Sequence, residues 1–186
     1  MTGLCGLVIA FLAFGAYSLW RVPRDYQAAG TLSGTAVGAV WGAYVLHAAA
    51  VVYAAWHGLV SVPLDRSLAR PIGGGLVLIG LSLTAAAVIQ FGSVRRLSGR
   101  ESAVLVKSGL YRCSRNPQNL SWAIALFGVA VTGRSLAAAL LVALLAYAIH
   151  VHIVAVEERH LENVFGEEYR AYRETVARYL GRPNSS

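Results

Sequence analysis

Charged side chains are scarce in this sequence, and the signatures of soluble enzymes are missing. Only 13% of its 186 residues are Asp, Glu, Lys or Arg, whereas 56% are hydrophobic. A single soluble core of this size cannot bury so much apolar surface, which excludes an ordinary water-soluble domain. We find no Walker loop, no GxSxG nucleophile elbow and no dinucleotide fingerprint. None of these three motifs of soluble enzymes therefore identifies a function for this chain.

Cysteine is equally scarce, since the chain has only Cys5 and Cys113. We expect the first in a membrane span and the second in a loop, so no disulfide between them is expected. The apolar run near the N-terminus could be taken for a signal peptide. No positive charge precedes it, and no small-residue cleavage site lies clearly within reach. We expect it to remain as a membrane anchor.

Long apolar stretches dominate what is present. A helix needs about 20 mostly apolar residues to cross the hydrocarbon layer. Five stretches come near this length, and they cover residues 4–19, 37–60, 72–91, 120–132 and 136–156. Only residues 133–135 separate the last two, which favours a tight helical hairpin. Gly73, Gly74 and Gly75 open the third stretch and predict close helix packing. The expected fold is all-α, a polytopic membrane protein with about five transmembrane helices.

The net charge of +7 is explained by membrane topology rather than by nucleic acid. Thirteen of the sixteen Lys and Arg residues follow the first, third and fifth stretches. The other three, Arg66, Arg70 and Arg134, fall at the opposite ends of the spans. The positive-inside rule then predicts an N-terminus outside and a C-terminus in the cytoplasm.

The C-terminal region alternates apolar and charged residues at helical spacing. Apolar side chains recur at intervals of three and four from Leu161 to Leu180, and charged residues occupy the positions between them. This pattern predicts a cytoplasmic amphipathic helix. Two roles are open and compatible: an interfacial anchor, or a cover over a cytoplasmic site.

Two polar clusters lie at the cytoplasmic ends of the last two predicted spans. One is GLYRCSRNPQNLS at residues 109–121, and the other is EERHL at residues 157–161. An antiparallel hairpin would bring them together, so that Arg115 and Asn119 face Glu157 and Glu158. Pro117 suits the first turn of the fourth span, where free amides and the helix dipole lie close to the carboxylates. Such a pocket suits a zwitterionic ligand.

The histidines do not favour a metal site. His150 and His152 are two positions apart and point to different faces of a helix. Glu157 and His160 have the Glu-x-x-His spacing of di-iron bundles, but the sequence has no second such motif. We therefore predict no metal.

Across the C-terminal half, the sequence resembles the membrane methyltransferase family of isoprenylcysteine carboxyl methyltransferase and the phospholipid methyltransferases. The resemblance is carried in order by Gly109, Tyr111 and Arg112; Arg115, Asn116 and Pro117; Glu157, Glu158 and Leu161; and Phe165, Gly166, Tyr169 and Tyr172. It implies S-adenosylmethionine as cofactor and methyl transfer to a small or lipid-like hydrophobic acceptor from the membrane, at its cytoplasmic face.

The resemblance also implies roles for individual residues. Glu157 and Glu158 are expected at the catalytic centre, and one of them would meet the ammonium group of the cofactor. The full set of expected cofactor-binding residues is Tyr111, Arg115, Asn116, Pro117, Asn119, Leu120, Glu157, Glu158 and Leu161. We expect a single membrane domain over residues 1–186, with three spans in 1–91 and the cofactor-binding part in 92–186.

Two other functions remain open at this stage. A membrane reductase would use a nicotinamide cofactor, held by the basic residues between Arg95 and Arg115. A non-catalytic membrane subunit with a decayed pocket is suggested by Asn119 and Ser121, where the family usually has Tyr and Gly. The sequence leaves open the acceptor, the methylated atom (N, O or S) and the oligomeric state.

Overall fold

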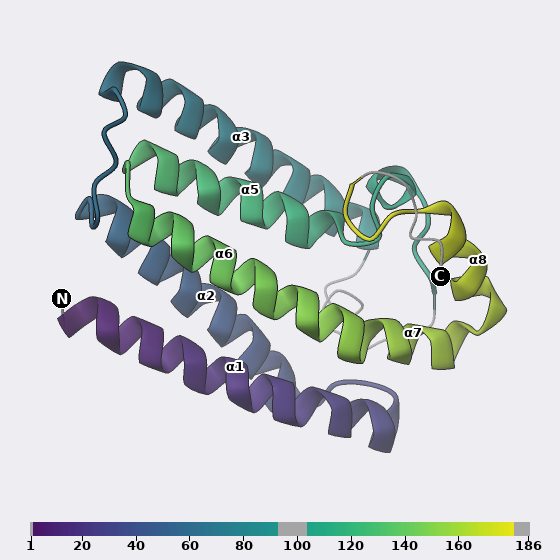
Figure 1. Ribbon diagram of the computed structural model, residues 1–186. Helices are drawn as coiled ribbons and strands as arrows, with labels where there is room; N and C mark the ends of the chain where they lie inside the picture. The colour runs from purple at the N-terminus through teal and green to yellow at the C-terminus, as the bar shows by residue number, and fades with distance from the viewer. Residues whose placement is uncertain (1, 93–103, 181–186) are drawn as a thin grey trace.

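The computed structural model describes residues 2–92 and 104–180, and their regular structure is helical. Five helices form a bundle: α1 (Thr2–Ala29), α2 (Gly34–Trp56), α3 (Arg66–Phe91), α5 (Pro117–Thr132) and α6 (Leu136–His152). Two short helices, α7 (Glu158–Phe165) and α8 (Glu167–Thr175), lie together at one end of it (Figure 1). The basic residues Arg95, Arg96, Arg100 and Arg182 lie outside the described residues.

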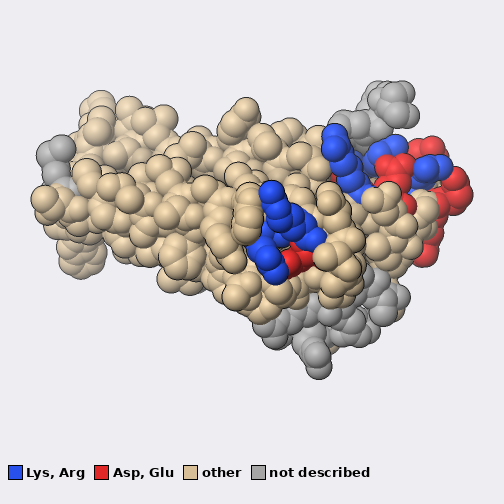
Figure 2. Space-filling view, turned by 90° about the horizontal axis from the view of Figure 1, so that it is seen from below, with Lys and Arg blue, Asp and Glu red and all other residues tan. Residues whose placement is uncertain are grey.

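The bundle is built to sit in a membrane. Four helices are long and apolar enough to cross one: α1, α2, α3 and the continuous helix from Leu136 to Phe165. The fourth predicted span, residues 120–132, corresponds to α5, which has 16 residues and packs against both α3 and α6. Figure 2 shows the charged side chains of one face gathered toward the end that carries α8, with the rest of that face free of them. The prediction of an all-α, multi-pass membrane protein is confirmed.

Glycines let α3 and α5 approach closely. A Cβ on Gly73 would lie 2.6 Å from the carbonyl oxygen of Gly128, and one on Gly80 would lie 2.5 Å from the backbone nitrogen of Ala125. The predicted close packing is therefore confirmed at Gly73. Gly74 and Gly75 differ, because a Cβ there would meet nothing within 4 Å.

The predicted hairpin between the last two spans is confirmed. Gly133, Arg134 and Ser135 connect α5 to α6, and Arg134 takes a left-handed conformation with φ of 51°. Ser135 caps α6 by accepting the backbone N–H of Ala138 at 3.1 Å, and its hydroxyl donates to the carbonyl of Leu59 at 2.6 Å. The turn thereby also ties the hairpin to the end of α2.

The last span continues beyond α6 as one helix that reaches Phe165. The π-helical segment η2 (Ile153–Glu157) joins α6 to α7. Such segments insert an extra residue into the helical turn and are frequent at functional sites. Glu157 ends this segment and Glu158 begins α7. The π-helical segment is a feature that the sequence pattern did not predict.

The prediction of one amphipathic helix from Leu161 to Leu180 is wrong. Gly166 has φ of 51° and ψ of −125°, which lies outside the helical region and separates α7 from α8. Helix α8 ends at Thr175, and Val176 is extended. The physical reason is that a glycine can adopt this backbone conformation at little cost, so the chain can turn there.

Candidate functional site

A cavity of about 160 Å³ lies at the end of the bundle where α7 and α8 pack. We call it the polar cavity. It is formed by the C-terminal ends of α1 and α3, the segment 104–118, and the chain from η2 to α8. Its wall consists of Tyr26, Phe91, Val104, Leu105, Val106, Tyr111, Arg115, Asn116, Gln118, Ile153, Glu157, Glu158, His160, Leu161, Phe165, Tyr169 and Tyr172.

A buried carboxylate with two arginines forms one side of this cavity. Glu158 is 8% exposed and accepts two hydrogen bonds from Arg178, at 2.8 Å from Nε and 2.9 Å from Nη2. Arg115 Nη1 lies 3.0 Å from the same carboxylate. The bond to Glu158 raises the pKa of Arg178 further above its ordinary value, so its guanidinium stays charged. Both oxygens of Glu158 are therefore engaged within the protein.

Arg115 keeps unused hydrogen-bond donors. Its side chain is buried, and besides Glu158 it contacts the hydroxyl of Tyr169, at 3.3 Å from Nη1. Its Nε and Nη2 atoms are buried and have no partner among the described residues. Leaving such donors unpaired is costly, and a wall residue with two of them can receive an anionic group such as a carboxylate.

The segment after α8 is held against the loop before α5. The backbone N–H of Arg115 donates to the carbonyl of Ala177 at 2.9 Å. The carbonyl of Arg178 accepts the Asn116 side-chain amide at 3.2 Å and the Ser114 hydroxyl at 3.3 Å. The polar side chains of Ser114 and Asn116 thus position the chain that carries Arg178.

Tyrosines of α8 close the cavity on its outer side. Tyr169 and Tyr172 are buried with Val176 and pack against Leu105, Leu161 and Phe165. The hydroxyl of Tyr172 donates to the carbonyl of Tyr111 at 2.6 Å. Burial raises the pKa of Tyr172 above its ordinary value, which keeps this donor protonated. Of the two roles considered for the C-terminal region, the structure shows the cover over the site.

Helix α1 contributes an aromatic stack. The rings of Tyr26 and His160 are nearly parallel, with centroids 3.7 Å apart and an interplanar angle of 8°. The Nε2 atom of His160 is buried and has no partner among the described residues. The stack therefore joins the end of α1 to α7 beside the polar cavity.

Glu157 differs from its neighbour Glu158. It is half-buried, and among the described residues its nearest basic group is His152, at 3.7 Å between Nε2 and Oε1. It lines the polar cavity and also a second cavity on the other side. Its carboxylate is thus available to a ligand in either cavity.

The second cavity, which we call the apolar cavity, has a volume of about 370 Å³. It shares Tyr26, Gln118 and Glu157 with the polar cavity, so the two adjoin. The remaining wall comes from α1, α2, α3, α5, the end of α6 and the segment after α1: Val22, Leu32, Val37, Val40, Trp41, Tyr44, Val45, Ala48, Thr84, Val88, Asn119, Trp122 and His152. Trp41 and Val45 are exposed on the outer surface of the bundle. The apolar cavity therefore reaches the surface that faces lipid.

Six of the nine residues expected to bind a cofactor line the polar cavity: Tyr111, Arg115, Asn116, Glu157, Glu158 and Leu161. Pro117, Asn119 and Leu120 are not in its wall. Pro117 begins α5, as predicted. Asn119 does not face Glu158 but accepts a hydrogen bond from the hydroxyl of Tyr44 at 2.8 Å in the apolar cavity. Leu120 lines a separate apolar groove between α5 and α6.

Several residues of the site are absent from the predicted set, among them Arg178, Gln118, Tyr26 and His160. Arg178 was predicted only as a basic residue of the cytoplasmic amphipathic helix, because its spacing of 20 residues from Glu158 gives no local sign of their ion pair. Gln118 lies within the predicted cluster and accepts a hydrogen bond from Tyr111. Tyr26 and His160 belong to distant segments, and only the tertiary structure brings their rings together.

Comparison with known proteins agrees with this geometry. A family model described as phospholipid methyltransferase matches residues 68–168, just over half of the chain. Comparisons with curated proteins and with solved structures gave no match. The matched region runs from α3 to Glu168 in α8 and includes both polar clusters. The chain therefore belongs to the phospholipid methyltransferase family of membrane proteins.

Proposed function

We propose that this protein transfers a methyl group from S-adenosylmethionine, bound in the polar cavity, to a lipophilic acceptor in the apolar cavity, at the cytoplasmic face of the membrane. The observation that carries the proposal is the pair of buried Arg115 donors that have no partner among the described residues, in a wall that also holds the carboxylate of Glu157. The amino-acid end of the cofactor has one carboxylate and one ammonium group, which match these two charges.

The residues of the polar cavity match the chemical groups of S-adenosylmethionine. The volume of the polar cavity has to increase before the cofactor fits. Arg115 would hold the carboxylate, Glu157 the ammonium, and the aromatic wall of Tyr26, His160 and Phe91 offers surfaces on which a base can stack. The described wall encloses about 160 Å³, below the several hundred Å³ typical of small-molecule sites. We expect binding to enlarge the cavity by moving α7 and α8.

The resemblance implied that one of the two glutamates meets the ammonium group, and the contacts of Glu158 favour Glu157 for that role. Both oxygens of Glu158 are used by Arg178 and Arg115, so it positions Arg115 rather than receiving the ammonium group. Glu157 is the carboxylate that faces ligand. Of the two residues expected at the catalytic centre, we propose Glu157 for direct contact and Glu158 as a positioning residue.

When bound, S-adenosylmethionine supplies an electrophilic methyl group on sulfur, which a nucleophile attacks in line. The protein has to orient the acceptor, exclude water and accept a proton if the acceptor carries one. Glu157 lies in the wall shared by the two cavities, where it can accept that proton. The apolar wall with Trp41 and Trp122 supplies the water-poor environment.

Calorimetric titration of the detergent-purified protein with S-adenosylhomocysteine tests the proposal, with a reduced nicotinamide cofactor titrated in parallel. We expect binding of the first, abolished in Arg115→Gln and Glu157→Gln. The matched control is Glu174→Gln, because Glu174 is exposed on α8 and does not line the cavity. Binding of the nicotinamide cofactor instead would support a reductase.

The non-catalytic alternative has its own test. If a folded protein binds neither compound, and Asn119→Tyr creates binding of S-adenosylhomocysteine, the natural pocket has decayed. We expect the natural protein to bind S-adenosylhomocysteine without this substitution, because Asn119 hydrogen-bonds to Tyr44 outside the polar cavity. Asn119→Tyr should leave affinity for S-adenosylhomocysteine unchanged and obstruct the apolar cavity.

A further inference from the structure

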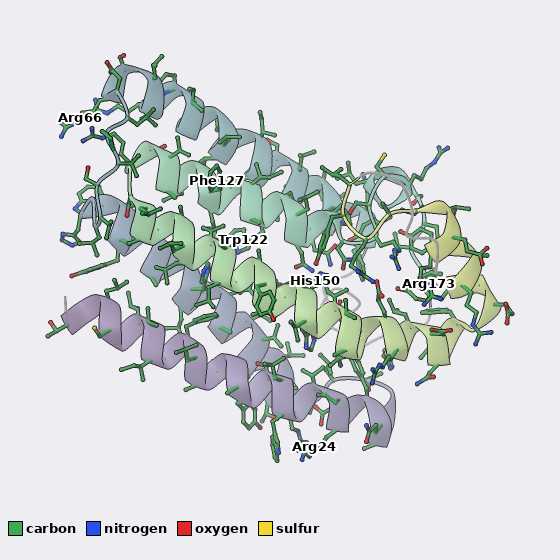
Figure 3. All side chains as sticks on the ribbon, viewed as in Figure 1. Arg24, Arg66, Trp122, Phe127, His150 and Arg173 are labelled. Carbon is green, nitrogen blue, oxygen red and sulfur yellow. The ribbon has the colours of Figure 1, made fainter. Side chains whose placement is uncertain are left out.

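A third cavity lies at the end of the bundle opposite the polar cavity. We call it the arginine cavity; its volume is about 840 Å³. It lies among the C-terminal end of α2, the N-terminal half of α3 and the α5–α6 turn. Figure 3 shows Arg66 at this end of the bundle and Arg173 at the other end. The cavity is therefore separate from the proposed methyl-transfer site.

All three basic residues that the sequence places at this end meet in the arginine cavity. Arg66 and Arg70 are one helical turn apart on α3, and Arg134 comes from the α5–α6 turn. Among residues 2–92 and 104–180, none of the three forms an ion pair with a carboxylate. Asp65 caps α3 by accepting the backbone N–H of Ser67 at 2.7 Å, and its carboxylate also feels the charge of Arg134. Arg134 Nη1 donates to the carbonyl of Leu64 at 3.0 Å. The cavity thus holds three positive charges against the single carboxylate of Asp65, an excess of positive charge within the described residues.

The cavity is amphipathic. Below the arginines its wall is made of aliphatic side chains, among them Val52, Val77, Leu78 and Val129. Gly74 is also in this wall, and a Cβ there would meet nothing within 4 Å, so the groove along α3 is open at that position. A ligand that fits has an anionic head and an apolar chain.

The surroundings place this cavity at the depth of lipid headgroups. Trp56 borders it and is 85% exposed, as is typical of tryptophans at the membrane interface. Arg66 lies at the start of a membrane-spanning helix, where an arginine side chain extends toward phosphates. A soluble anion would use the arginines alone, whereas a lipid uses both parts of the wall.

We propose that the arginine cavity binds an anionic phospholipid of the leaflet opposite the methyl-transfer site, with its phosphate on Arg66, Arg70 and Arg134 and one acyl chain along α3 past Gly74. The occupant is a structural or regulatory lipid rather than the methyl acceptor, because the arginine cavity shares no residue with the polar cavity or with the apolar cavity.

Native mass spectrometry of the full-length protein in detergent tests this, with dioleoyl phosphatidylglycerol as probe. We expect its retention to fall about tenfold in the double variant Arg66→Gln/Arg70→Gln, since two charge-assisted contacts are lost. Arg159→Gln removes an exposed arginine at the other end of the molecule and should retain the lipid. Dioleoyl phosphatidylcholine should bind more weakly than the probe, because its choline would face the arginines.

A second pair of variants tests the contact with the acyl chain of the lipid and leaves the three arginines unchanged. Gly74→Leu fills the groove and should lower retention, whereas Gly75→Leu, equally open but outside the cavity wall, should not. Equal retention by the wild type and the double arginine variant would overturn the proposal. So would displacement of the lipid by inorganic phosphate with full retention in Gly74→Leu, because the ligand would then be a soluble anion.

Discussion

Glu157 and Glu158 are neighbours in the sequence, but their carboxylates have different surroundings. Glu158 is enclosed by Arg115 and Arg178. Glu157 lines both cavities, and among residues 2–92 and 104–180 its ion-pair partner is His152. A buried ion pair is costly to break on one side only, whereas a free carboxylate contributes little to stability. Substitution of Glu158 should therefore mainly lower the stability of the fold, and substitution of Glu157 should mainly affect ligand binding.

We predict opposite results for two glutamine variants. Glu158→Gln should lower the free energy of unfolding by about 3 kcal/mol, since buried arginines lose their counter-charge. Glu157→Gln should change it by less than about 1 kcal/mol but abolish binding of S-adenosylhomocysteine. Thermal unfolding in detergent and calorimetry measure the two effects. Equal loss of stability in both variants would contradict the assignment, and Glu174→Gln is the control.

At the scale of helices, the α3–α5 contact depends on Gly80. A single Cβ there would lie 2.5 Å from the backbone nitrogen and 2.7 Å from the Cα of Ala125, and rigid backbone cannot move aside cheaply. We predict that Gly80→Ala lowers the free energy of unfolding by about 2 kcal/mol. Gly75→Ala is the matched control on the same helix, where the added Cβ meets open space. Thermal unfolding of the two variants should differ clearly, and equal midpoints would refute this packing.

The corner between α7 and α8 depends on the backbone of Gly166. Its φ of 51° and ψ of −125° strain any residue with a side chain, although a Cβ would meet no neighbour within 4 Å. We predict that Gly166→Ala costs about 1–3 kcal/mol locally and displaces Tyr169 and Tyr172 from the polar cavity. Affinity for S-adenosylhomocysteine, measured by calorimetry, should fall. Unchanged affinity would show that the corner does not shape the cavity, and exposed Glu174→Ala serves as the reference.

For the whole molecule, the distribution of arginines predicts which end faces the cytoplasm. Cys113 is exposed at the end with the polar cavity, and Ser67 is exposed at the other end. In a Cys5→Ala background, a membrane-impermeant maleimide should label Cys113 only in inverted vesicles. In a protein lacking both native cysteines, Ser67→Cys should be labelled only in intact cells. The reverse pattern would invert the proposed topology.

Much of the fold could be predicted because membrane insertion depends on local properties of the chain. The apolar stretches predicted the spanning helices, and Gly133–Ser135 predicted the hairpin, since length and hydrophobicity act within each segment. The two polar clusters were predicted to meet for the same reason: a short turn makes neighbouring helices antiparallel. Arg115 and Glu158 do meet, at 3.0 Å.

The contacts that define the cavities could not be predicted, because they depend on how distant segments pack. Gly166 and the π-helical segment decide the direction of α7 and α8, and neither leaves a periodic signal. The pairs Arg178–Glu158, Tyr26–His160 and Tyr44–Asn119 join segments 20 to 134 residues apart. Hydrophobicity and helix periodicity are local, so the sequence was enough to predict a helical membrane protein with two converging polar clusters. Which of the two carboxylates is held by arginines depends on how distant segments pack, so it became clear only from the folded chain.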